Sequence, residues 1–136
     1  MWRPLRKTFA LALFALVAVA FACASSSSSQ LKNGVWGGDD VIVNVDSGGA
    51  EIEFACAHGR ITKPLTLDGK GNFDLPGTFS AESHGPVRDD NSTTSNVRYR
   101  GHVEGDTMTL TIVQDKRELG PYVLTRGSQR ILRKCR

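Results

Sequence analysis

The stretch VIVNVDSGGAEIEFAC, residues 41–56, decides the fold. Its first half places three valines at every second position, and its second half alternates apolar residues with glutamates in the same way. A period of two is typical of β-strands with one buried face. Between the halves, Ser-Gly-Gly at residues 47–49 supplies the positive φ that a tight hairpin needs. The stretch therefore predicts two antiparallel strands joined by a short turn.

The same period recurs toward the C-terminus, with glycine-rich turns between the segments and no helical period of ten residues. The Pro76-Gly77 pair interrupts one segment and predicts a bulge or an edge there. Together with the first hairpin, these segments suggest about eight strands. The further expected segments are 65–67, 73–79, 97–103, 108–112, 122–124 and 131–135, the last of which closes the chain.

Short links between successive strands predict an antiparallel, up-and-down arrangement. Eight such strands can close into a small barrel that has no free edge. The alternative is a two-sheet β-sandwich, whose crossing connections are longer, and only residues 82–96 offer that length. The expected fold class is therefore all-β, with the barrel favoured over the sandwich.

The N-terminus carries an export signal. Arg3, Arg6 and Lys7 precede the uncharged segment 9–24, which matches the basic and apolar regions of a secretory signal peptide. The apolar segment is shorter than the roughly 20 residues of a spanning helix. We therefore expect residues 1–24 to direct the chain out of the cytoplasm, an uncleaved anchor being the alternative.

Two cleavage chemistries fit the end of this signal. Ala-Cys-Ala at residues 22–24 suits ordinary signal peptidase, which would free Ser25. The segment also resembles a bacterial lipobox, in which Cys23 becomes the acylated first residue. Residues 25–33 are rich in serine and would then tether a domain at 34–136 to the membrane.

Cysteine parity agrees with a lipid on Cys23, because Cys56 and Cys135 then remain as a pair for one disulfide in an oxidising compartment. The bond would close a loop of about 80 residues and stabilise the domain by roughly 4 to 5 kcal/mol in the chain-entropy account. Such a link matters because a domain of this size buries less than about 70% of its extended-chain surface.

Composition and motifs exclude several classes of function. Without the three basic residues of the signal, fourteen basic residues balance fourteen acidic ones, which leaves no basis for nucleic-acid binding. No nucleophile elbow, zinc-protease motif or P-loop occurs, so we expect neither an enzyme nor a cofactor. The histidines His58, His84 and His102 lack the spacing of metal ligands. We expect no metal site, and we expect His58 to serve a turn.

The polar segment 82–96 is the strongest candidate for a binding loop, since long loops in compact domains are usually functional or disordered. The basic residues between 126 and 136 form a second candidate, able to attract anionic headgroups or an acidic partner. The alternative for the loop is disorder without function, and the alternative for the basic residues is a solvated face of the last strand. The loop residues that would contact a partner are His84, Arg88, Asp89 and Asp90.

The Gly34-Val35-Trp36 motif, taken with Arg126 or Arg130 near the last strand, resembles the calycin signature of lipocalins, avidins and small bacterial protease-inhibitor barrels. The resemblance implies that Trp36 closes one barrel end while a basic side chain packs across its ring, a contact of about 0.5 to 2 kcal/mol. The Cys-Ala-His-Gly run at residues 56–59 is also similar to small exported bacterial (lipo)proteins without assigned activity.

These observations predict a binding module of the bacterial cell envelope, lipid-anchored or free in the periplasm. It would bind a small ligand or an extracytoplasmic protein at a loop-bearing end. The alternative is a periplasmic inhibitor of a hydrolase. A ligand binder should show an apolar cavity open at one end, whereas an inhibitor should have an interior filled by Phe54, Phe73, Phe79 and Leu110.

Overall fold

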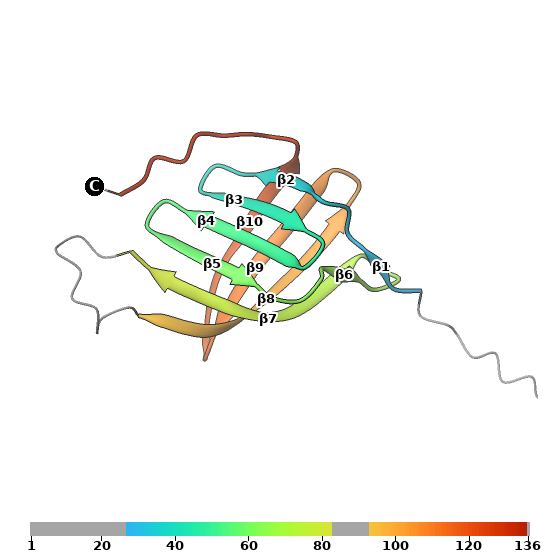
Figure 1. Ribbon diagram of the computed structural model, residues 1–136, viewed down its shortest axis with the longest axis horizontal. Coiled ribbons are helices and arrows are strands. Elements are labelled where there is room, and N and C mark those ends of the chain that lie inside the picture. The colour runs from blue at the N-terminus through green and yellow to red at the C-terminus, as the bar shows by residue number, and fades with distance from the viewer. Residues whose placement is uncertain (1–26, 83–92, 136) are drawn as a thin grey trace, which may run out of the picture.

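The computed structural model describes residues 27–82 and 93–135. Eight of its strands form a closed antiparallel barrel and two short ones form a separate pair (Figure 1). No helix occurs among the described residues. The strands are β1 (Ser29–Gln30), β2 (Gly34–Gly37), β3 (Val41–Asp46), β4 (Gly49–Phe54), β5 (Ala57–Ile61), β6 (Thr66–Leu67), β7 (Asn72–Ala81), β8 (Thr94–Glu104), β9 (Thr107–Gln114) and β10 (Arg117–Arg126).

Each barrel strand pairs with the next along the chain, in the order β10-β2-β3-β4-β5-β7-β8-β9. The last strand returns to the first through only two residue pairs, Thr125 with Gly37 and Arg126 with Trp36. The expected all-β, up-and-down barrel is thus confirmed, and the sandwich alternative is wrong.

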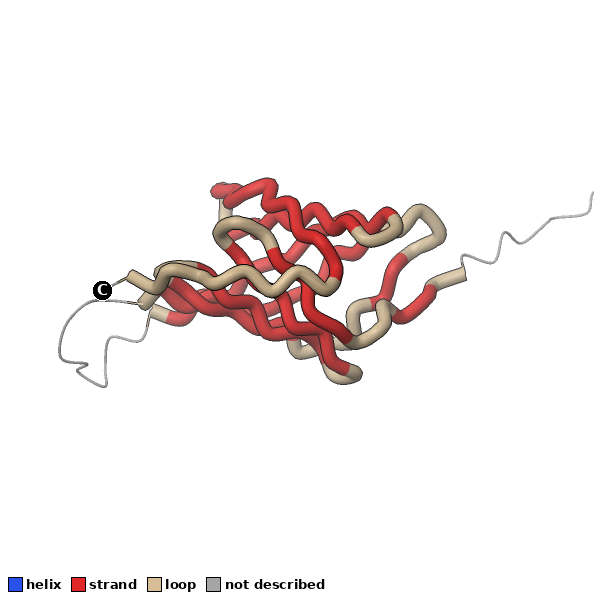
Figure 2. Tube along the Cα trace, turned by 90° about the horizontal axis from the view of Figure 1, so that it is seen from above, coloured by secondary structure: helices blue, strands red, loops and turns tan. Residues whose placement is uncertain are grey.

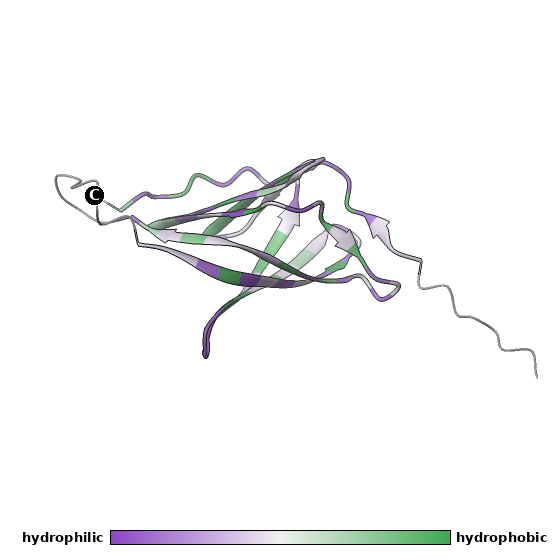
Figure 3. Cartoon of the chain, turned by 60° about the horizontal axis from the view of Figure 1, so that its bottom comes forward, coloured by the Kyte–Doolittle hydropathy of each residue, from purple (hydrophilic) through white to green (hydrophobic). Residues whose placement is uncertain are grey.

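The hairpin predicted at residues 41–56 is formed by β3 and β4, which pair from Val41 opposite Phe54 to Asp46 opposite Gly49. Its turn is closed by the Asp46 carboxylate, which accepts a hydrogen bond of 2.8 Å from the Gly48 N–H. Apolar residues of both strands face the core, and polar and apolar positions alternate along the strands in Figure 3.

Strand β5 corrects an expectation from the sequence. His58 does not serve a turn, because it is the second residue of β5 and lies opposite Glu53 on β4 and Ser80 on β7. The alternation of β5 was hidden because one of its inward positions is Gly59. A Cβ atom there would lie 1.9 Å from the Tyr99 hydroxyl, so the tyrosine occupies the space that a side chain would fill.

The Pro76-Gly77 pair does not produce a bulge, since β7 stays in continuous register with β8. Strand β5 pairs with β7 only as far as Gly77, so Pro76 lies just past this pairing, where its missing N–H is not needed. A register shift occurs instead in β10, between Leu119 and Tyr122.

Residues 131–135, expected as a closing strand, are not a strand. Residues 129–135, which we call the strap, turn back from the end of β10 along the outside of the barrel (Figures 1 and 2). Cys135 forms the predicted disulfide with Cys56, with 5.2 Å between their Cα atoms. The backbone N–H of Cys135 also donates to the Ala55 carbonyl at 2.9 Å.

The two ends of the barrel differ. At the end that we call the closed end, the β3–β4 turn lies against the β1–β6 pair, because Gln30 of β1 donates a hydrogen bond to the Ser47 carbonyl. At the opposite end, which we call the open end, the β4–β5 link carries the disulfide. Between them the interior is packed with apolar side chains, including Phe73, Tyr99 and Leu110.

Candidate binding recess at the open end of the barrel

The closed end is sealed first by Trp36, which is fully buried on β2. The Arg126 guanidinium carbon lies 5.7 Å from the centre of the Trp36 ring, within the range of a cation–π contact. The calycin resemblance offered two arginines for this place, and the structure puts Arg126 there. Arg130 instead pairs with Asp39 on the surface.

The N-terminal arm completes the closure. Leu31 is buried, and its N–H donates to the Leu65 carbonyl at 2.8 Å. Leu65 and Leu67, from the β5–β7 connection, are buried as well. The Gln30 side chain donates to the Ser47 carbonyl at 3.2 Å and fixes the arm to the β3–β4 turn. Part of the predicted 25–33 tether therefore packs against the domain.

The open end holds an apolar recess of about 410 Å³. Three aromatic rings dominate it. The Phe54 ring centre is 5.6 Å from that of Phe79 and 5.5 Å from that of Tyr122. Both spacings are those of favourable tilted or edge-to-face aromatic pairs. The complete lining consists of Asp40, Phe54, Ala55, Cys56, Ala57, Phe79, Ala81 and Tyr122.

The recess exists because the barrel seam is incomplete toward this end. Strand β2 stops at Gly37, so β10 meets it only at Thr125 and Arg126. In the described residues, the earlier part of β10 pairs with β9 alone, and Tyr122 is only partly buried. Residues 27–82 and 93–135 therefore do not cover the core side chains at this end as they do at the closed end.

The polar groups at the recess are Asp40 and the Tyr122 hydroxyl. Burial raises the pKa of Tyr122, and the negative charge of Asp40 raises it further. The phenol is consequently neutral at neutral pH. It offers one hydrogen-bond donor at the edge of an otherwise apolar surface, a combination common in small-molecule sites.

Several residues singled out in the sequence fall outside the described part of the chain. They are Cys23 and the loop candidates His84, Arg88, Asp89 and Asp90. The strands that flank residues 83–92 do reach the open end, because Ala81, the last residue of β7, lines the recess.

The basic C-terminal residues do not form a free patch throughout. Lys134 donates to the Phe54 carbonyl at 3.1 Å and to the Glu82 carboxylate at 3.3 Å. The His58 ring lies 3.6 Å from the same carboxylate. Together with the pair between Arg130 and Asp39, these contacts attach the strap to the barrel.

No metal or membrane-spanning feature appears in residues 27–82 and 93–135. No three His, Cys, Asp or Glu side chains there lie close enough to hold a metal ion. Among the same residues, no helix has the length and apolarity to cross a bilayer. Glu51, on the outer face of β4, accepts a 2.6 Å hydrogen bond from Arg60.

Sequence reasoning did not bring Tyr122 and Asp40 together in one site. The alternation of Tyr122 with Leu124 placed Tyr122 on an inward face, but nothing in the sequence showed that the barrel is open beside it. Phe54 and Phe79 were considered only as fillers of the interior, whereas the structure places them at the edge of the packed core.

No protein-family model, curated protein or solved structure matches the chain. The fold and the recess therefore define its class by themselves, a small eight-stranded antiparallel barrel with one disulfide and one open end.

Proposed function

We propose that the protein is a non-catalytic binding module of the bacterial cell envelope, and that the open end of the barrel is its binding end. The basic and apolar N-terminal segment and the lipobox-like Cys23 support export and membrane attachment, with release to the periplasm as the alternative. The observation that carries the proposal is an apolar, aromatic recess at one end of a barrel whose other end is sealed.

The recess suits an apolar group with one polar substituent. Covering the rings of Phe54, Phe79 and Tyr122 removes apolar surface from water, which contributes about 25 cal/mol for each Å² buried. Tyr122 and Asp40 supply the few polar contacts that orient a ligand. Because the barrel interior is filled, the ligand inserts one group into the recess and does not enter the barrel.

The filled interior also favours the second candidate, an inhibitor of an extracytoplasmic hydrolase. Phe73, Tyr99 and Leu110 are fully or almost fully buried and leave no lipocalin-like chamber between them. In this case the occupant of the recess is an apolar side chain on the surface of the hydrolase. Both candidates use the same end of the barrel.

The test uses the apolar dye N-phenyl-1-naphthylamine and the chain from Ser25 onward, which carries the domain without lipid. Ala81→Trp is the decisive variant, because Ala81 lines the recess and is exposed, so the new ring fills the recess with little cost to folding. Asn96→Trp is the matched control, since Asn96 is an exposed residue of neighbouring β8 and does not line the recess.

We expect dye fluorescence to rise when the unmodified domain or Asn96→Trp is added. With Ala81→Trp, the apparent affinity for the dye should be at least tenfold lower. Equal binding by all three proteins would refute the recess as the ligand site. If the dye does not bind, the hydrolase candidate is examined by capture of periplasmic proteins, which Ala81→Trp should abolish. The intact mass of the full chain made in a bacterium shows whether Cys23 carries a lipid.

A further inference from the structure

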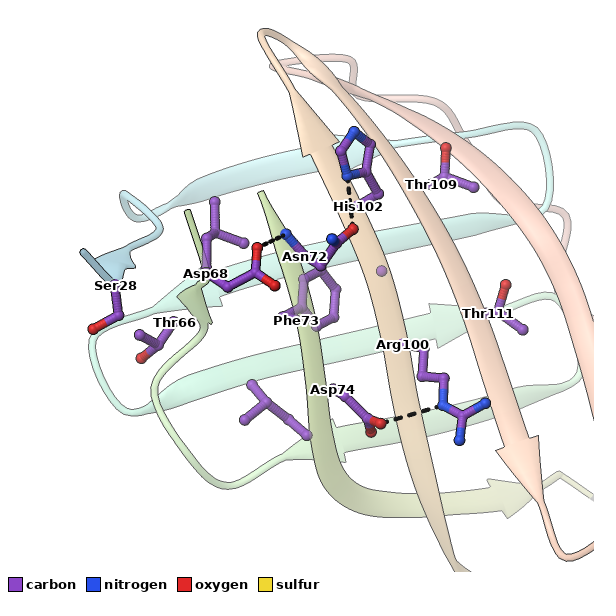
Figure 4. A pocket seen from close by; sticks show the side chains of 13 residues that line it. Ser28, Thr66, Asp68, Asn72, Phe73, Asp74, Arg100, His102, Thr109 and Thr111 are labelled. Atoms are coloured by element: carbon purple, nitrogen blue, oxygen red, sulfur yellow. Dashed lines mark hydrogen bonds and ion pairs between the residues drawn. The ribbon is translucent and has the colours of Figure 1, made fainter. Parts of the chain in front are cut away.

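A second hollow lies on the outside of the barrel, toward the closed end, and is independent of the recess. Its volume is about 650 Å³, within the range of about 300 to 1,000 Å³ typical of small-molecule sites. We call it the outer groove (Figure 4). Its lining consists of Ser28, Thr66, Leu67, Asp68, Asn72, Phe73, Asp74, Leu75, Arg100, Gly101, His102, Thr109 and Thr111.

Most of the polar lining comes from the outer faces of β7, β8 and β9. Arg100 pairs with Thr111, and His102 pairs with Thr109, whereas Leu110 between the two threonines is buried in the core. Since side chains alternate between the two faces of a sheet, these four side chains lie on the outer face. The side chains of Arg100 and His102 are about half exposed, at 52% and 45%.

The polar side chains are held in place before any ligand arrives. His102 Nδ1 lies 2.8 Å from Asn72 Oδ1, and Arg100 Nε donates to Asp74 Oδ2 at 3.2 Å, as the dashed lines in Figure 4 show. Arg98 Nε donates to the other oxygen of Asp74 at 2.7 Å. Fixed side chains lose less conformational freedom when a ligand binds.

Charges of both signs lie in and beside the groove. Asp74 is paired with Arg98 and Arg100, Glu118 lies 3.9 Å from Arg100, and Lys70 lies near Asp68. The Asp68 carboxylate accepts the backbone N–H groups of Asn72 and Lys70, which lowers its pKa and keeps it ionised. An anionic ligand would face the two carboxylates, and a cationic ligand would face the guanidinium groups.

Hydroxyl groups match such a surface, because each of them both donates and accepts a hydrogen bond. A hydroxyl can donate to Asp74 and accept from Arg100 without bringing a charge of its own. Thr109 and Thr111 add two protein hydroxyls on the same face (Figure 4). Leu75, which is only partly buried, contributes apolar surface beside these groups, suited to the C–H face of a sugar ring.

We propose that the outer groove binds a neutral carbohydrate that lies across β7, β8 and β9. The groove is open along the sheet and its volume exceeds that of the recess, so it suits a short oligosaccharide. This site is separate from the recess, and the proposal does not depend on the function proposed for the open end.

The test presents the disulfide-bonded chain from Ser25 onward to an array of neutral and acidic oligosaccharides. The variant Thr109→Val/Thr111→Val removes both hydroxyls and keeps the shape and β-branching of the side chains. Thr107→Val is the matched control, on the same strand and face but outside the groove lining. We expect binding to neutral glycans that weakens at least tenfold in the double variant and is unchanged in the control.

The recess variant Ala81→Trp should leave glycan binding unchanged, which separates the two sites. The proposal would be overturned if the domain bound none of the neutral glycans on the array, or if it bound acidic glycans alone. Equal loss in Thr107→Val and in the double variant would also overturn it. The proposal would also be overturned if the domain selected extended peptides from a random peptide library and the double variant abolished their binding. The groove would then be a peptide site.

Discussion

The two ends of this barrel are built from the same kind of strand and yet are finished differently. At the closed end, Trp36 lies under Arg126, and Leu31, Leu65 and Leu67 cover what remains. At the open end, the core stops at three aromatic rings, of which Phe54 is buried and Phe79 and Tyr122 are partly buried. The comparison shows that Trp36 and Arg126 of the barrel strands act together with leucines outside the barrel to close one end. Among residues 27–82 and 93–135, no comparable set of side chains covers the other end.

The strap and its disulfide take the place of such a cover at the open end. They join the last residues of the chain to the β4–β5 link, on the edge of the recess. A covalent link stabilises mainly by restricting the unfolded chain, so it adds stability without burying the recess. The strap thus stabilises the domain and leaves the recess open among the described residues.

The largest expected effect comes from removing that link. In Cys56→Ser/Cys135→Ser the free energy of unfolding should fall by about 4 to 5 kcal/mol, because the disulfide closes a loop between residues 79 apart. Urea unfolding measures the loss. Hydrogen exchange should rise around the β4–β5 link more than around Trp36, and a loss below about 1 kcal/mol would contradict this role of the strap.

Truncating one aromatic residue at each end compares the two ends directly. Trp36→Ala should cost about 3 to 4 kcal/mol, because it empties a fully buried site. Tyr122→Ala should cost about 1 to 2 kcal/mol, because Tyr122 is only partly buried and the recess beside it is already open to solvent. Similar losses in urea unfolding would mean that the open end is as tightly packed as the closed one.

The arginine at the closed end should contribute less than the tryptophan that it covers. Arg126→Ala should reduce the free energy of unfolding by about 0.5 to 2 kcal/mol through loss of the cation–π contact. Arg130→Ala serves as control, and should cost less than about 1 kcal/mol because its partner Asp39 is exposed. If Arg130→Ala lowered the free energy of unfolding more than Arg126→Ala, then Arg130 of the strap, and not Arg126, would be the arginine that stabilises the closed end.

The smallest expected effect is a difference between the pKa values of the two tyrosines, Tyr99 and Tyr122. Burial raises the pKa of both above the usual value of 10.0, and Tyr99, whose hydroxyl donates to the Thr78 carbonyl at 2.6 Å, is the more deeply buried. Stability from the neutral phenols is complete below pH 10, where unfolded tyrosine keeps its proton. It declines as the pH rises toward the folded pKa values.

Absorbance at about 295 nm, the region of the tyrosinate band, follows this titration in the folded protein. The step that remains in Tyr99→Phe reports Tyr122, and the step that remains in Tyr122→Phe reports Tyr99. We expect Tyr122 to ionise at the lower pH. Coincident titration of the two would contradict the difference in burial between the barrel interior and the open end.

Strands with a clear apolar alternation were predicted well. Strands β3, β4, β8 and β9 lie where the period of two indicated, because each has one face toward a packed core. Strand β5 was missed because the inward position at Gly59 is filled by Tyr99, which comes from a strand forty residues later. A pattern within one segment holds no information about a side chain supplied by another.

The candidate site was predicted less completely than the fold. Cysteine parity identified the disulfide between Cys56 and Cys135, and the calycin-like motif placed Trp36 beside a late arginine. The recess depends on where β10 leaves β2, and the outer groove depends on the register of β7 with β8 and of β8 with β9. Neither relation can be read from hydrophobic periodicity.

The sequence by itself determined the strand period, the hairpin turns and the cysteine pair, because each of these follows from local conformational preference or from a count of residues. Only the tertiary structure decided which barrel end is sealed, that the last residues form a strap, and which polar side chains share a groove. These features arise from contacts between distant segments. Such contacts depend on register and packing, which local preferences leave undetermined.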